Sequence, residues 1–125
     1  MHQIIETKLA PNAIGPYSQA TMKNGLLFVS GQIPIDPETS LLIENDVKKQ
    51  TRQVLDNLRA IIIEAGMSLE NVMKCSCFLS DMENFAAFNE IYSEYFGSLC
   101  PARECVEVAR LPKDVLVEVS AICME

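Results

Sequence analysis

Histidine is almost absent from this 125-residue sequence, whose single histidine, His2, lies next to the first residue. Enzymes that pair a serine or cysteine nucleophile with histidine need that base within hydrogen-bond reach of the nucleophile. The composition therefore disfavours a Ser-His or Cys-His enzyme. The sequence also has no histidine cluster and no paired Cys-x-x-Cys motif that would bind zinc, so we expect no metal centre.

Positive charge is scarce as well. Ten Lys and Arg residues stand against 17 Asp and Glu residues, which gives a formal net charge of −7, and no basic run exceeds Lys48-Lys49. Proteins that grip a phosphate backbone usually have a basic face, because much of their affinity comes from counterion release. The sequence therefore disfavours nucleic acid as a partner, while a local basic patch stays open.

Long apolar runs are missing too. No stretch approaches the roughly 18 apolar residues that a membrane helix needs, and the first residues do not resemble a signal peptide. The five cysteines are odd in number and form no paired framework, which favours a reduced, cytoplasmic setting. We expect Cys75 and Cys77 to be buried small hydrophobic residues rather than metal or redox groups. The length predicts one domain, residues 1–125, with a real core.

The hydrophobic pattern predicts the order βββαβαββ. One helix is expected over residues 46–65, ending before Gly66, and a second over residues 80–96, opened by a capping box at Ser80 and Glu83. Strands are expected at residues 3–7, 17–22, 26–30, 72–79, 104–109 and 115–124, the last two flanking one turn. This order predicts an α+β fold with a single six-stranded sheet and both helices on one face.

The last strand predicts two different faces for that sheet. One side of the strand is wholly apolar and suits burial under the helices: Val115, Val117, Val119, Ala121 and Cys123. The strand at 72–79 alternates alike, with Met73, Cys75, Cys77 and Leu79 on the covered side. The opposite face is too apolar for open water and too polar for a closed core, so we expect a homo-oligomer with pockets at its subunit interfaces. We place Arg103 and Glu118 on this second face.

Arg103 and Glu118 are the first candidates for chemistry. Arg103 follows Pro101 at the start of an apolar strand, and Glu118 stands in the middle of the next one. An arginine offers a rigid fork of donors that fits a carboxylate at two points, which a lysine does not. Arg103 is therefore a candidate anchor for a substrate carboxylate.

Three motifs give the sequence a specific resemblance. Ala13-Ile14-Gly15-Pro16-Tyr17-Ser18-Gln19-Ala20, Ser30-Gly31-Gln32-Ile33-Pro34, and Pro101-Ala102-Arg103 through Val117-Glu118-Val119 resemble the reactive intermediate deaminase family. This family is also called Rid/YjgF or endoribonuclease L-PSP, and the match runs through nearly the whole chain. Among its branches, the motifs are most similar to the archetype that hydrolyses imines.

The resemblance implies a chorismate-mutase-like fold and a barrel-forming homotrimer with a clefted site at each of three subunit interfaces. It implies a 2-iminobutanoate/2-iminopropanoate deaminase, which turns reactive enamine and imine intermediates into 2-oxo acids and ammonia. It implies no metal and no organic cofactor.

The same resemblance suggests roles for particular residues. Arg103 would hold the substrate carboxylate, and Glu118 would orient water and shuttle protons as a general base and then acid. Further substrate-binding positions would be the backbone at Gly31 and Cys105 and the side chains of Tyr17, Ser30 and Asn89. Structural alternatives stay open: interface ion pairs for Arg103 and Glu118, loop packing for Tyr17, and capping of backbone groups by Ser30 and Asn89. A nucleophilic Cys105 is disfavoured because no base accompanies it.

One position departs from the family. Its closing strand usually has a second glutamate two residues after the first, where this chain has Ser120, so an ion pair of that second acid should be absent.

Two other functions stay open beside imine hydrolysis. One is an endoribonuclease or translation inhibitor, and the other is a non-catalytic trimer that binds small carboxylates.

Overall fold

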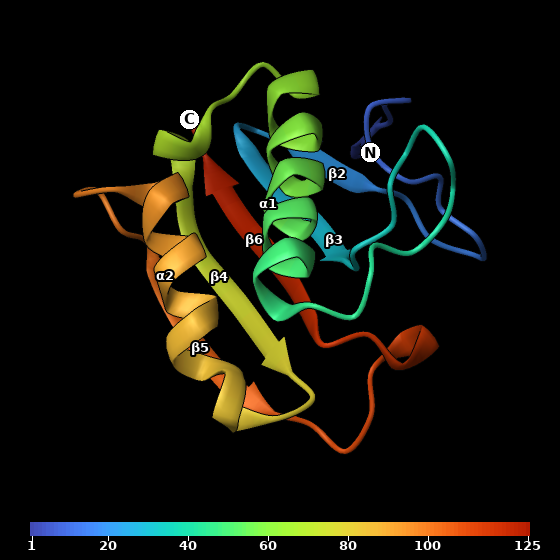
Figure 1. The fold of residues 1–125 in the computed structure, drawn as a ribbon. Helices are drawn as coiled ribbons and strands as arrows, with labels where there is room; N and C mark the ends of the chain where they lie inside the picture. Colours follow the sequence, from blue (N-terminus) through green and yellow to red (C-terminus); the bar gives the residue numbers. More distant parts are fainter.

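The computed structural model describes residues 1–125 and has the expected order of strands and helices. The strands are β1 (Gln3–Ile5), β2 (Ala20–Lys23), β3 (Leu26–Gln32), β4 (Val72–Leu79), β5 (Ala102–Glu107) and β6 (Val117–Met124). The helices are α1 (Val47–Glu64) and α2 (Phe85–Phe96), with short 3-10 turns η1 (Leu69–Asn71), η2 (Met82–Asn84) and η3 (Pro112–Asp114). All six strands form one sheet, and both helices lie on one of its faces (Figure 1). The predicted α+β architecture is confirmed.

The strand order across the sheet is β1-β2-β3-β6-β4-β5. Only β4 and β5 are parallel neighbours, joined through α2, and every other pair is antiparallel. The last two strands flank one turn in the sequence but are not neighbours, because β4 lies between them. The last strand of the chain therefore occupies the middle of the sheet.

Two predicted strand boundaries near the N-terminus shift because the backbone finds other partners. β1 stops at Ile5 because the backbone N–H of Thr7 donates to Oε1 of Gln19 (2.7 Å) instead of to a neighbouring strand. β2 begins at Ala20 because the N–H of Tyr17 closes a tight turn on the carbonyl of Gly15 (3.0 Å). The residues between Ile5 and Ala20 that were predicted as strand therefore belong to a loop, and this loop forms a wall of the candidate site.

The predicted capping box at Ser80 and Glu83 is wrong. The side chain of Asp81 accepts from the backbone N–H of Glu83 (2.9 Å) and caps η2, and α2 starts only at Phe85. Asp46 caps α1 in the same way by accepting from the N–H of Lys49 (3.0 Å). An aspartate at a helix N-terminus satisfies backbone donors that lack a partner within the helix.

The covered face of the sheet is the core, and the alternation of β6 builds its centre. Val117, Val119 and Cys123 have no exposed surface, and Val115 and Ala121 are almost completely buried, as predicted. Cys75 and Cys77 are likewise fully buried, and burial raises the pKa of both thiols. The start of β4 differs from the prediction: Val72 is buried and Met73 is 58% exposed, because a bulge between Val72 and Lys74 shifts the alternation.

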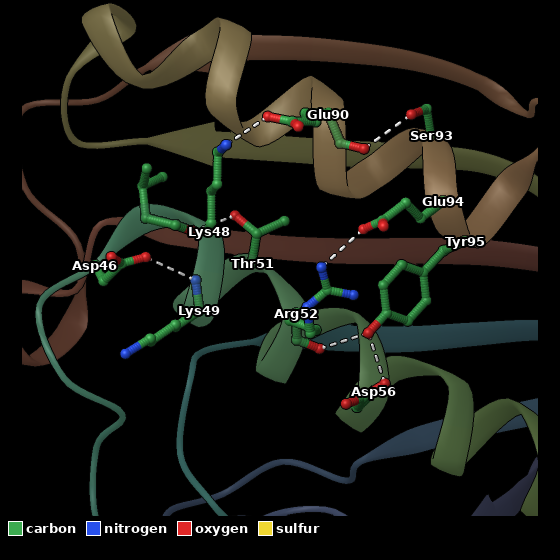
Figure 2. A network of polar contacts seen from close by, with 11 residues as sticks. Asp46, Lys48, Lys49, Thr51, Arg52, Asp56, Glu90, Ser93, Glu94 and Tyr95 are labelled. Atoms are coloured by element: carbon green, nitrogen blue, oxygen red, sulfur yellow. Dashed lines mark hydrogen bonds and ion pairs between the residues drawn. The ribbon is translucent and has the colours of Figure 1, made fainter.

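A ladder of polar contacts joins the outer surfaces of the two helices (Figure 2). Lys48 pairs with Glu90 (2.6 Å), and one turn further along each helix Arg52 pairs with Glu94 (2.8 Å). The hydroxyl of Tyr95 donates to Asp56 (2.7 Å), the next residue of the α1 series. Exposed ion pairs contribute little to stability, so the ladder aligns the helices while the apolar core beneath them supplies the stability.

The opposite face of the sheet has no covering layer and keeps the mixed character expected from the sequence. Its register places Phe28 of β3 beside Ile122 of β6, which pairs with Lys74 of β4. Phe28 and Val106 leave 49% and 44% of their surface exposed. Neither helix is long and apolar enough to span a bilayer.

Two buried amides of α1 hold the loops that leave the sheet. Asn57 is 1% exposed, and its Nδ2 donates to the carbonyls of Ile33 (3.3 Å) and Ile35 (2.9 Å) just beyond β3. Gln50 accepts the backbone N–H of Leu116 (2.9 Å) just before β6. Because buried backbone groups need partners, these amides fix two loop positions that the sheet itself does not bond.

Replacing Asn57 with leucine should destabilise the fold by about 1–3 kcal/mol, because the carbonyl of Ile35 loses its buried donor and that of Ile33 keeps only the N–H of Ile35. Urea unfolding at a fixed protein concentration measures the change. Asn45→Ala is the control, since Asn45 is an exposed residue in the loop before α1. An Asn57→Leu midpoint equal to that of the wild type would contradict the tethering role.

Candidate functional site

Three of the residues singled out in the sequence line one cavity of about 430 Å³: Tyr17, Gly31 and Glu118. Tyr17 comes from the loop before β2, Gly31 from the end of β3 and Glu118 from the start of β6. Lys113 of η3 also lines this cavity. The cavity therefore sits where three loops meet the ends of the central strands.

Gly31 makes room for the carboxylate of Glu118. It lies where the pairing of β3 with β6 is irregular, between Val29 and Gln32. A Cβ atom added to Gly31 would lie 2.9 Å from Cδ of Glu118 and 3.2 Å from its Cγ, and closer still to Oε1. The carboxylate thus lies directly against the backbone of β3, in space that only a glycine leaves open.

Glu118 is a half-buried acid without a partner. Its carboxylate takes part in no ion pair and accepts no hydrogen bond from the chain, while burial raises the pKa of Glu118 above its ordinary value. Burial has this effect because it disfavours the charged form of a carboxyl group. A carboxyl group with a raised pKa in a cavity is suited to accept and return a proton.

Gln19 holds the wall of this cavity and was given no role from the sequence. Its side chain is 3% exposed; Oε1 accepts from Thr7 (2.7 Å), and Nε2 donates to the carbonyls of Thr7 (3.0 Å), Ala10 (3.3 Å) and Pro11 (2.7 Å). The sequence offers no signal for this role, because side chains alternate along a strand and a polar residue beside Ala20 is ordinary there. Asn57 and Gln50, in contrast, could have been noticed as amides on the apolar side of α1.

Arg103 belongs to a second cluster, beneath α2. Its guanidinium donates to Oδ1 of Asn89 (2.7 Å) and lies over the ring of Tyr92, 4.7 Å from the centroid. The rings of Phe85 and Phe88 are 5.6 and 5.8 Å away. No carboxylate of the chain pairs with Arg103. The aromatic rings and one amide therefore hold a cation whose remaining donors are available to an acidic ligand.

Cys105 lies two residues after Arg103 on the same side of β5, beside the buried Cys77 in the neighbouring strand. Burial raises the pKa of the Cys105 thiol, and the nearby Arg103 opposes this shift. No histidine lies near it, since the sole histidine is His2. The structure thus gives Cys105 no activating base.

The two clusters lie on opposite faces of the sheet. Arg103 pairs in register with Cys75 and Glu118 with Phe78, and residues three apart on β4 point to opposite sides. The prediction that Arg103 shares the uncovered face with Glu118 is therefore wrong: Arg103 points toward α2. Within one chain, Asn89, Arg103 and Cys105 form one group, and Tyr17, Gly31 and Glu118 form another.

Ser30 lies beside the group formed by Tyr17, Gly31 and Glu118, but its side chain has a structural contact of its own. Its hydroxyl donates to the carbonyl of Ser18 (2.7 Å), and its backbone N–H donates to the carbonyl of Gln19 (2.9 Å). This is the backbone-capping alternative that the sequence left open. The contact joins the loop that carries Tyr17 to the end of β3.

Ser120, which stands at the position of the family's second glutamate, faces Ser76 across β4 on the uncovered face. An acid is nevertheless present in this row, because Ser76 donates to Glu104 of β5 (2.6 Å) and Lys74 pairs with Glu104 (3.1 Å). The acid that forms an ion pair in this row, Glu104, thus comes from β5 rather than from β6.

Nowhere does the structure gather three His, Cys, Asp or Glu side chains in a group that could hold a metal ion.

Comparison with known proteins identifies the family. Residues 7–125 match the family described as Endoribonuclease L-PSP. A RutC family protein of Pyrococcus horikoshii is 55% identical over 122 residues, which cover 98% of this chain and 97% of the relative. This chain belongs to the endoribonuclease L-PSP family, also called Rid/YjgF. The membership expected from the three sequence motifs is confirmed.

Solved structures of L-PSP proteins share the whole fold. A Thermotoga maritima protein, provisionally named an endoribonuclease, superposes with a TM-score of 0.98 at 48% identity over 100% of this chain and 98% of its own. Escherichia coli TdcF, crystallised with bound serine, superposes with a TM-score of 0.94 at 44% identity over 98% of each chain. TdcF of strain K12 is provisionally named a reactive intermediate deaminase. Both kinds of name, nuclease and deaminase, therefore occur among close relatives of this L-PSP chain.

Replacing Gly31 with alanine should displace the Glu118 carboxylate from its half-buried position and lower the pKa of Glu118 toward its ordinary value. The measurement is a carbon-13 NMR titration of the glutamate carboxyl groups, with Glu118→Gln used to assign the signal. The backbone of Gly31 lies outside the left-handed region, so alanine adds only the steric contact. An unchanged pKa in Gly31→Ala would show that the close contact does not position the acid.

Proposed function

We propose that this protein is an imine deaminase that hydrolyses small 2-imino acids, with 2-iminobutanoate and 2-iminopropanoate as the expected substrates. The observation that carries the proposal is the unpaired guanidinium of Arg103, held by Asn89 and three aromatic rings. A 2-imino acid has a carboxylate next to the imine carbon, and two parallel N–H···O bonds from Arg103 would hold it. The relative TdcF, crystallised with serine, supports a small ligand with a carboxylate.

We further propose that the working site forms between two subunits of a homotrimer. One chain would supply Arg103, Asn89 and Cys105, and its neighbour would supply Glu118 and the Gly31 backbone. Two features support this arrangement. An unpaired cation and an unpaired, half-buried acid lie on opposite faces of one chain, and the uncovered face has the mixed apolar character of an interface.

In this site Glu118 would act on water. The carboxylate accepts a proton from a water molecule as the water oxygen bonds to the imine carbon, and the imine nitrogen takes up a proton. The resulting carbinolamine carries one hydroxyl and one amino group on the former imine carbon. A second proton moves from the hydroxyl to the amino group, the C–N bond breaks, and the 2-oxo acid and ammonia leave. The imine is already reactive, so positioning by Arg103 supplies much of the required acceleration.

RNA cleavage is the second candidate, and the family description and the name of the T. maritima relative favour it. The net charge of −7 argues against a surface that grips a phosphate backbone. The variants Arg103→Ala and Glu118→Gln separate the two functions. Metal-free RNA cleavage that disappears in these variants would favour the nuclease. Cleavage that persists in every variant would point to a contaminating enzyme.

Arg103→Ala should lower kcat/KM for 2-iminobutanoate by about 10- to 100-fold, because charge-assisted hydrogen bonds to the carboxylate are lost. Glu118→Gln should lower kcat instead, since the amide keeps the size of the side chain but accepts no proton. The imine is generated in the assay by a threonine dehydratase, and its disappearance is followed directly. Arg59→Ala on the outer face of α1 is the matched arginine control. Wild-type rates in both site variants would refute the proposed roles.

Mixing the two impaired variants tests the shared site. In a trimer assembled at random from Arg103→Ala and Glu118→Gln chains, about a quarter of the interfaces would combine an intact Arg103 with an intact Glu118. Unfolding and refolding the mixture should therefore restore about a quarter of the wild-type activity. Each variant refolded alone is the control. No recovery from a mixture shown by mass spectrometry to contain hybrid trimers would place both residues of each site in one chain.

A further inference from the structure

Four positive side chains have no acidic partner, although acids outnumber bases in this chain. The ion pairs occupy six of the ten Lys and Arg residues. The four that remain are Lys8, Lys23, Arg103 and Lys113. Arg103 belongs to the proposed deaminase site, and Lys23 lies at the exposed hairpin turn between β2 and β3. Lys8 and Lys113 are left without a role, 105 residues apart in sequence.

Lys8 and Lys113 line one cavity of about 360 Å³, together with the polar residues Asn12 and Ser40. No Asp or Glu lines it. Each of the other four principal cavities has at least one carboxylate in its wall. In a chain of net charge −7, this cavity has two lysines and no carboxylate in its wall.

The acid next to Lys113, Asp114, already has a partner in Arg110. Lys113 and Asp114 both have left-handed backbone conformations, with φ of 55° and 56°. Such conformations are uncommon outside glycine and asparagine, and they persist where the surrounding structure imposes them. The carboxylate of Asp114 is engaged at both oxygens by Arg110 (2.7 and 3.2 Å). The nearest acid in sequence is thus already neutralised, and Lys113 faces the cavity unpaired.

The basic cavity adjoins the cavity of Glu118. The two share five lining residues: Pro11, Asn12, Ile14, Ile35 and Lys113. The loop that carries Pro11 is fixed by Gln19, and the carbonyl of Ile35 is held by Asn57. The wall between the two cavities is therefore built from tethered loop residues.

We propose that the cavity of Lys8 and Lys113 is a binding site for a phosphate group, either free phosphate or the phosphate of a small monoester. The ammonium of lysine is a compact point charge with three donors, and lysine binds phosphate groups as such a point charge. Two lysines match the charge of about −2 that a phosphate monoester carries near neutral pH. The amide of Asn12 and the hydroxyl of Ser40 offer neutral donors for the remaining oxygens.

Titration with inorganic phosphate and with glycerol phosphate, followed by amide NMR at constant ionic strength, tests this site. Both probes are used because free phosphate and a monoester share the chemistry but differ in source, and the tighter probe identifies the source. We expect saturable shifts around the cavity in the wild type. Lys8→Gln and Lys113→Gln should each weaken binding by about tenfold or more, the loss expected for one charge-assisted hydrogen bond.

Two controls make the result decisive. Lys23→Gln removes the same charge outside the cavity, and Arg103→Ala removes the other unpaired cation. Both should bind phosphate as the wild type does. Absence of saturable binding, equal weakening by Lys23→Gln, or loss only in Arg103→Ala would each overturn the proposal. No imine is present in this assay, so its outcome is independent of the proposed deaminase activity.

Discussion

The alternation of side chains along β6 is the constraint on which the rest of the structure depends. This strand lies in the middle of the sheet, between β3 and β4. Val117, Val119 and Cys123 point under the helices and are fully buried, so their neighbours must point to the uncovered face. Glu118 reaches its cavity because the residues on either side of it are core residues. A slip of one residue would put the carboxylate in the core and the valines in the open, so packing fixes the position of the acid.

The charges of Arg103 and Glu118 lie on opposite faces of the sheet within one chain. Arg103 lies in an aromatic surround on the covered side of the edge strand β5, and Glu118 lies against Gly31 on the other side of the sheet. Neither has a partner of opposite charge, although exposed pairs are plentiful on the helices. Leaving charges partly buried and unpaired is unfavourable, and such groups concentrate at functional sites. An assembly that brings the two half-sites together would give both groups a ligand.

Three buried amide side chains join the core to the loops around the candidate sites. Gln19, Gln50 and Asn57 use their side chains to satisfy backbone groups of the loops that wall the cavities. A loop held in this way keeps its shape at the cost of a few core positions that would otherwise be apolar. The loops that wall the cavities are thus hydrogen-bonded to the core, whereas the outer ladder joins only α1 and α2.

The sequence by itself determined the element order, the two helices on one face, the core side of β6 and the motif residues of the family, because period-two and period-3.6 patterns are local properties of the chain. It also identified Arg103 and Glu118 as unusual charges. Only the tertiary structure decided that β4 separates β5 from β6, that Arg103 points toward α2 while Glu118 points away, and that Lys8 and Lys113 share a cavity. These facts follow from the strand order, from the register of β5 and β6 on β4 and from loops tied by distant amides. No local pattern encodes them, because each depends on contacts between residues far apart in the sequence.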